Sequence, residues 1–186
     1  APRKGSLLSF RPDIKVLDAT LRDGGLCNDF RFSDEFAKAL YAMNLAAGVD
    51  YMEMGYKASR ALFDADKFGK YKFCDEKDLR AVVGDNKPGM KLSVMADVGR
   101  TYFRKDILPK KESVLDMVRV ACYINEIPAA IEMIEHCKKL GYETCANVMA
   151  VSKANDEEID DALRMLGESP VDVIYLVDSY GALYPE

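Results

Sequence analysis

The sequence predicts an α/β fold of the (β/α)8 TIM-barrel type, with about six βα units in its 186 residues and therefore an incomplete barrel. Apolar strand-like runs alternate with helix-like segments at a pitch of roughly 30 residues, as in such barrels. The strand-like runs are almost continuously apolar, which is typical of a parallel sheet covered by helices. A doubly wound open sheet is the alternative, but Arg22-Asp23-Gly24-Gly25 after the first strand is not a glycine-rich nucleotide loop.

The expected elements follow from local signals. A helix begins at the N-cap Ser33 and stops at Gly48, a later helix has Pro128 in its first turn, and Asn155 with Glu158 forms a capping box. Segment 56–73 exceeds the usual connection length and is therefore a functional or a mobile loop. The predicted strands are 14–21, 49–54, 91–96, 117–124, 143–151 and 171–177, and the predicted helices are 33–48, 75–83, 128–141 and 155–167.

Composition and charge narrow the function classes. The chain is 49% hydrophobic and 31% charged, as in soluble globular proteins. A net charge of -5 and the lack of a basic patch argue against nucleic-acid binding, and no apolar run is long enough for a membrane span. Five cysteines without metal-binding or redox spacing indicate a reduced, cytoplasmic protein. We expect residues 1–13 to be a lead-in and residues 14–186 to be one barrel domain, truncated before a seventh strand.

The first strand ends at a charged pair with a clear chemical use. Arg22 offers a planar fork of donors for a carboxylate or an enolate oxygen, and Asp23 is a hard oxygen ligand for a divalent cation. Gly24 and Gly25 would let the backbone turn tightly and leave the site open. The alternative is a solvated ion pair before a glycine turn.

Polar residues also follow the other predicted strands, and in a barrel they would converge on one rim. The alternative is that strand ends are polar because loops are polar. The thiol of Cys27, just past the first motif, is a further candidate if a cation activates it. The rim candidates are Glu53, Asp97, Tyr123, Asn125, Ser152, Asp178 and Ser179.

Two segments, 18–24 (Asp-Ala-Thr-Leu-Arg-Asp-Gly) and 178–182 (Asp-Ser-Tyr-Gly-Ala), resemble the DRE-TIM metallolyase superfamily. Within it the chain is most similar to the 4-hydroxy-2-oxovalerate aldolases. Segment 118–121 resembles the fourth strand of that family, and the spacing through His136 to the last strand is similar as well. The resemblance covers nearly the whole chain after the first dozen residues.

This resemblance implies a divalent-metal-dependent aldolase or lyase that makes or breaks a carbon–carbon bond next to a 2-oxo acid, through a pyruvate enolate. Asp23 would bind Mn²⁺ or Mg²⁺, and Arg22 would be catalytic and bind the 2-oxo acid. Ser179 and Tyr123 would contact the substrate, whereas Asp178 would shape the rim. The family also implies a homo-oligomer or an aldehyde dehydrogenase partner.

Three departures from the family pattern matter. The family's metal takes two histidines from a His-x-His on the seventh strand, whereas the only histidine here, His136, lies in a helix on the outside of the barrel. The stretch after the charged pair lacks the family's proton-transfer histidine, and Tyr123 stands where aldolases tend to have another. Tyr123, Cys27 or a water molecule would have to move the proton, and the printed chain would bind metal weakly.

Two other functions stay open. A Claisen-type synthase that condenses an acyl-CoA with a 2-oxo acid uses the same Arg-Asp pair, although the glutamate–glutamine pair common in synthases is missing after Gly24. The missing histidines also suit a barrel that has lost catalysis and serves as a binding module.

Overall fold

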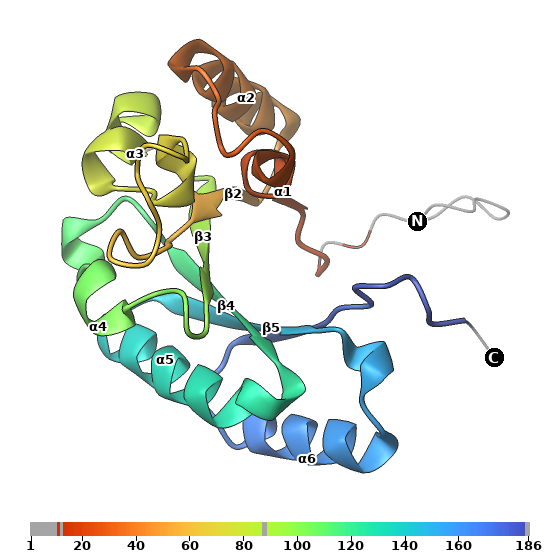
Figure 1. The fold of residues 1–186 in the computed structure, drawn as a ribbon. Helices are drawn as coiled ribbons and strands as arrows, with labels where there is room; N and C mark the ends of the chain where they lie inside the picture. Colours follow the sequence, from red (N-terminus) through yellow and green to blue (C-terminus); the bar gives the residue numbers. More distant parts are fainter. Residues whose placement is uncertain (1–10, 12, 87–88, 185–186) are drawn as a thin grey trace, which may run out of the picture.

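The computed structural model describes residues 11, 13–86 and 89–184. Six parallel strands form one sheet in the order β1-β2-β3-β4-β5-β6, and the sheet curls into a half-barrel (Figure 1). The predicted incomplete TIM-barrel-like fold is confirmed, and the doubly wound alternative is wrong because its strand order would have to reverse. The strands are β1 (Leu17–Asp18), β2 (Tyr51–Tyr56), β3 (Lys91–Asp97), β4 (Met117–Tyr123), β5 (Glu143–Met149) and β6 (Val173–Leu176).

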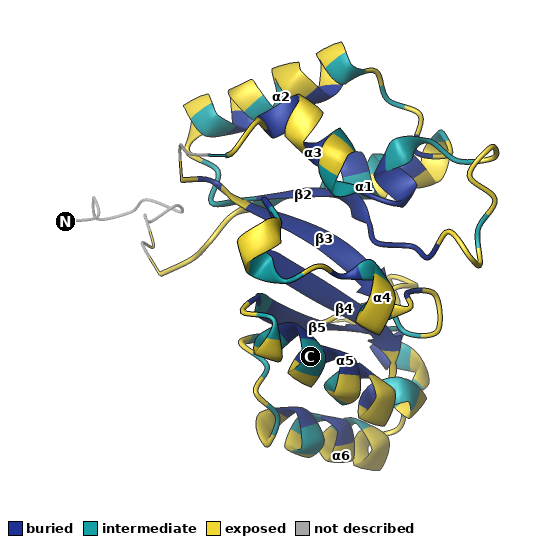
Figure 2. Ribbon diagram, turned by 90° about the vertical axis from the view of Figure 1, so that its left-hand side faces the viewer, coloured by how far each residue is buried: buried dark blue, intermediate teal, exposed yellow. Residues whose placement is uncertain are grey.

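The long helices lie on the outer face of the sheet, and each turns its buried side toward the strands (Figure 2). The α-helices are α1 (Thr20–Gly24), α2 (Asp34–Ala47), α3 (Glu76–Val83), α4 (Phe103–Asp106), α5 (Ile127–Lys139) and α6 (Asp156–Gly167). The 3-10 turns are η1 (Gly25–Cys27), η2 (Lys70–Lys72), η3 (Lys110–Glu112), η4 (Ile124–Glu126) and η5 (Val151–Lys153). No helix within the described ranges is both long enough and apolar enough to cross a membrane.

The predicted helix ends are confirmed. Ser33 Oγ accepts a hydrogen bond from the Phe36 amide at 3.2 Å, and Gly48 ends α2 in the left-handed region at a φ of 73°. Asn155 and Glu158 form the expected capping box at the start of α6. These ends were predictable because each cap depends only on residues within one turn.

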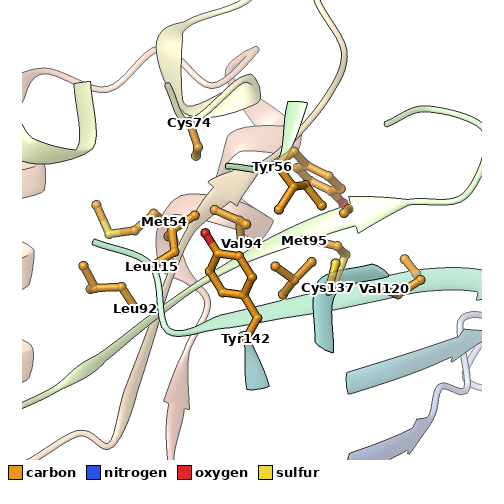
Figure 3. Close-up of a cluster of buried hydrophobic side chains, with 14 of the residues drawn as sticks. Met54, Tyr56, Cys74, Leu92, Val94, Met95, Leu115, Val120, Cys137 and Tyr142 are labelled. Atoms are coloured by element: carbon orange, nitrogen blue, oxygen red, sulfur yellow. The ribbon is translucent and has the colours of Figure 1, made fainter. Parts of the chain in front are cut away.

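The space between the sheet and the helices is filled by apolar side chains (Figure 3). Leu92 and Val94 of β3 are fully buried there, and so is Cys137 of α5. Burial raises the pKa of the Cys137 thiol to about 12, so this cysteine acts as a small apolar residue. This core holds the strands rigidly, and it therefore fixes the side chains on the opposite face.

The first strand is much shorter than the predicted 14–21, because only Leu17–Asp18 pairs with a neighbour. Thr20 donates from its hydroxyl to Asp18 Oδ1 at 2.6 Å, and α1 starts at this turn. Arg22 and Asp23 therefore lie on a one-turn helix. The second strand lies two residues later than predicted, at 51–56, and most of the predicted lead-in (1–10 and 12) lies outside the described residues.

The expected role of Gly24 and Gly25 as a tight turn is wrong. Both residues have ordinary helical φ values, -60° and -59°. Gly25 is required for a different reason, because an added Cβ would lie 2.2 Å from the Phe30 ring. The glycine thus lets the segment after α1 fold back over the end of β2.

Candidate functional site

A row of polar side chains crosses the inner face of the curled sheet, and Glu53 of β2 is its centre. Arg22 donates from Nε to Glu53 Oε2 at 2.7 Å, and Arg119 of β4 donates from Nη1 to the same oxygen at 2.8 Å. The Glu53 carboxylate is fully buried. The sequence placed Glu53 at the rim, whereas it lies within β2 and neutralises two cations.

Arg119 extends the row toward the far edge of the sheet. Its Nη2 donates to Asn147 Oδ1 of β5 at 3.0 Å, and its guanidinium carbon lies 4.8 Å from the centre of the Tyr175 ring of β6. Arg119, Asn147 and Tyr175 are not among the site residues that the sequence predicts. The one available signal was an arginine inside an otherwise apolar strand, which has to find a buried partner.

Arg22 links this buried row to the open end of the half-barrel at the carboxyl ends of the strands, which we call the mouth. Its Nη1 donates to Asp23 Oδ1 at 2.8 Å, and the Asp23 side chain is 70% exposed whereas that of Arg22 is 17% exposed. Burial opposes the charge of Arg22, but the attraction and hydrogen bond of Glu53 outweigh it, so the pKa of Arg22 is raised. The predicted pair is therefore brought together, with a fixed cation beside an accessible carboxylate.

The metal expected at Asp23 would find few ligands in this part of the protein. Among the described residues, no three His, Cys, Asp or Glu side chains are grouped closely enough to hold an ion. Asp23 offers one accessible carboxylate, and Glu53 is already bound by two arginines. These residues do not form a metal site by themselves, and Asp23 could supply one ligand of a larger set.

Tyr123 and Ser179 lie at the ends of β4 and β6. Tyr123, Ala150 and Lys153 line a pocket of about 270 Å³, and Ser179 Oγ accepts a hydrogen bond from the Ala150 amide at 2.9 Å. Neither residue has a hydrogen bond to Arg22 within the described ranges. The structure thus places both residues on the mouth side of the sheet, beside a pocket whose lining does not include Arg22.

Asp178 and Asp97 differ in environment. Asp178 accepts hydrogen bonds from the amides of Leu183 and Ala182 at 2.9 and 3.0 Å, which lower its pKa and hold the turn after β6. Asp97 at the end of β3 is largely buried, and this burial raises the pKa of its carboxyl. Its Oδ1 is buried without a hydrogen-bond partner in the described structure.

His136 lies on α5, outside the barrel, as expected. Its ring packs edge-on against Phe103, with centroids 5.2 Å apart. Burial and the nearby charges of Arg104 and Lys139 lower the pKa of this imidazole. Cys27 lies on η1 and is exposed.

Curated proteins with related sequences carry one recurrent name. The chain is 29% identical over 173 residues to a 4-hydroxy-2-oxovalerate aldolase of Moorella thermoacetica and 25% identical over 179 residues to one of Rhodococcus jostii. These matches cover 93% of this chain but 50% and 48% of the relatives, so the chain spans about half their length. The predicted resemblance is confirmed. No family model matches the chain.

A solved structure supports the fold. The N-terminal domain of a proposed aldolase from Bacteroides vulgatus superposes with a TM-score of 0.60 at 22% identity. The superposition covers 86% of this chain and 62% of that one. At this identity the likeness shows the arrangement of the strands and helices alone.

Proposed function

We propose that the protein carrying this chain is an aldolase-type carbon–carbon lyase that acts on a 2-oxo acid through its enolate. The supporting observation is the fixed guanidinium of Arg22. Its Nε and Nη1 donate to Glu53 and Asp23, and no hydrogen bond of Nη2 is found among the described residues, so Nη2 would be the donor to a substrate oxygen. The aldolase names of the sequence relatives support the same reaction class.

The cleavage of a 4-hydroxy-2-oxo acid explains why a fixed cation is useful. The C4 hydroxyl gives its proton to a base, for which Tyr123, Cys27 and a water molecule are the candidates, the C3–C4 bond breaks, and an aldehyde leaves. The electron pair of that bond becomes the C2–C3 double bond of an enolate, with negative charge on the C2 oxygen. Arg22 would face this oxygen and stabilise the charge as it develops, because its donors are already oriented.

We further propose that Asp23 would be one ligand of a divalent cation, Mn²⁺ or Mg²⁺, in the complete protein. When bound, such an ion would supply Lewis-acid stabilisation of the same oxygen. Asp23→Asn should weaken Mn²⁺ binding by the full-length protein in calorimetry, whereas the exposed Asp66→Asn should leave it unchanged. Equal binding by both variants would remove Asp23 from the ligand set.

The test of the reaction is release of pyruvate from a 4-hydroxy-2-oxo acid by the full-length protein. Arg22→Met should lower the rate on the order of 10²-fold or more, since a preoriented donor to the developing oxyanion is lost. Arg104→Met is the matched control, because Arg104 pairs with Glu132 on the surface. Circular dichroism would check that both variants fold. If the unmodified protein cleaves none of a panel of 4-hydroxy-2-oxo acids, the proposed function is wrong.

A further inference from the structure

A β-bulge in β2 places Tyr56 on the inner face of the sheet. Glu53 pairs with Ser93 of β3, but Tyr56 pairs with Met95, so three steps along β2 match two steps along β3. In a regular strand, residues three apart point to opposite faces. The extra residue brings Tyr56 to the same face as Glu53, and bulges redirect side chains in this way.

Gly55 makes the bulge possible. Its φ is 149°, and an added Cβ would lie 2.0 Å from the carbonyl oxygen of Tyr71. The loop that ends in η2 therefore packs directly on the bulged backbone. The ring also meets the edge of Phe30, with centroids 5.5 Å apart.

The Tyr56 hydroxyl lies among the charged groups of the mouth. Burial and the negative charges of Asp97 and Glu53 raise the pKa of the phenol, and the positive charge of Arg22 opposes them. Tyr56 is 9% exposed in total. It is therefore an ordered phenol beside the guanidinium that would bind the enolate oxygen.

Lys72 of η2 provides a second cation, on the face of the Tyr56 ring. Its Nζ lies 4.6 Å from the ring centre, and three phenylalanine rings surround the same ammonium. The Lys72 residue is 7% exposed, and no carboxylate within the described ranges comes within 4 Å of it. Burial lowers the pKa of Lys72, whereas Asp97 opposes this shift. The phenylalanines are Phe30, Phe63 and Phe68, at 4.9, 4.6 and 5.6 Å.

We propose that Tyr56 is the proton-transfer residue of this site and that Lys72 is its positioning residue, an inference that rests on the proposed function. The Tyr56 phenolate takes a proton from C3 of the 2-oxo acid, and the electron pair of that C–H bond forms the C2–C3 double bond of the enolate. In the cleavage direction, the Tyr56 phenol gives its proton to C3 after the aldehyde has left. Two flanking cations, Arg22 and Lys72, stabilise the phenolate in either direction.

The test is exchange of the C3 protons of pyruvate for deuterium in D2O, followed by proton NMR with the full-length protein. Tyr56→Phe should lower the exchange rate by 10²-fold or more. Tyr41→Phe is the matched control, because Tyr41 lies on α2, on the outer face of the sheet, and its hydroxyl donates to Asn86 Oδ1 at 2.7 Å. We expect Tyr41→Phe to keep the wild-type rate.

The pH profile separates proton transfer from a structural role. The wild-type exchange rate should rise with pH, because the reactive phenolate becomes more abundant as the pH approaches a raised pKa. The groups that face the phenol are Arg22, Glu53 and Asp97, together with Lys72 on the ring. Lys72→Met removes one cation, so the rise should move to higher pH. A purely structural role for Lys72 would lower the rate equally at every pH and overturn its assignment.

The outcomes for the two proposals are distinct. If Tyr56→Phe exchanges protons like the wild type while Arg22→Met does not, Tyr56 is not the proton-transfer residue, but the proposed function stands. If the wild type neither exchanges nor cleaves any 2-oxo acid, the proposed function itself fails.

Discussion

A single oxygen of Glu53 accepts hydrogen bonds from two guanidinium groups, those of Arg22 and Arg119. Each arginine is itself largely shielded, with side chains 17% and 7% exposed. A buried charge is tolerated only when it is paired, so the three residues depend on one another. The catalytic candidate Arg22 therefore owes its orientation to a residue that would not touch substrate.

Glu53→Gln should destabilise the fold by about 3–5 kcal/mol, because two buried cations would lose their counter-charge. The free energy of unfolding in urea measures this change. Glu132→Gln is the control, since Glu132 pairs with Arg104 at the surface and should cost less than about 1 kcal/mol. Similar losses in both variants would contradict the assigned role of Glu53.

Asp97 gives a pH-dependent prediction. Burial raises its pKa above the ordinary value of 3.8, so the folded protein prefers the protonated acid. The contribution of Asp97 to the free energy of unfolding should therefore fall as the pH rises from below 3.8 through the raised value. Asp97→Asn should be more stable than the wild type at neutral pH, and the difference in unfolding temperature should shrink toward pH 3. A difference that does not depend on pH would contradict this.

At the scale of elements, the bulge of β2 and the loop packed on it act as one unit. Gly55 carries the unusual backbone, and Tyr71 supplies the carbonyl that excludes any side chain there. The sequence showed a long loop at 56–73 but not its attachment, because the contact joins residues that are distant along the chain. Helix ends such as Ser33 were predictable, because a cap is a local interaction.

Gly55→Ala should lower the free energy of unfolding. Backbone strain at such a φ usually costs about 1–3 kcal/mol, and the clash of the new Cβ with the Tyr71 carbonyl oxygen adds to this cost. The substitution should also lower pyruvate proton exchange by displacing Tyr56. Gly167→Ala is the control, because Gly167 has an ordinary φ and nothing within 4 Å of an added Cβ. The unfolding temperatures of both variants measure this difference in stability. A stable, active Gly55→Ala protein would show that the bulge is dispensable.

At the scale of the whole molecule, the sheet formed by the described residues has an open edge at β1 and another at β6. β1 and β6 are each paired with one neighbour, and Val16 and Leu176 beside these edges are 55% and 52% exposed. Unpaired strand edges with apolar side chains invite pairing with another chain.

The 186-residue chain produced alone should therefore self-associate as its concentration rises, measured by sedimentation. Leu176→Lys should reduce this association, because a lysine at an edge strand opposes pairing. Met43→Lys is the control for the β6 edge, since Met43 is 67% exposed but lies on α2, which packs beside β1 at the opposite end of the sheet. Equal association of the two variants would exclude the β6 edge as the contact.

The sequence predicted the strand–helix alternation and most of the element boundaries, because these depend on nearby residues. It did not predict that Arg119, Asn147 and Tyr175 would meet, since their approach depends on how strongly the sheet curls. It also missed the reorientation of Tyr56, because a one-residue bulge leaves almost no trace in an apolar run.

The strand order has a consequence for how the chain acquires its structure. Each strand after β1 pairs with the strand directly before it in the sequence. During synthesis, each newly made unit can thus dock on one that already exists, without waiting for a distant partner. Folding can proceed from the N-terminus in small steps, each closing only a short stretch of polypeptide.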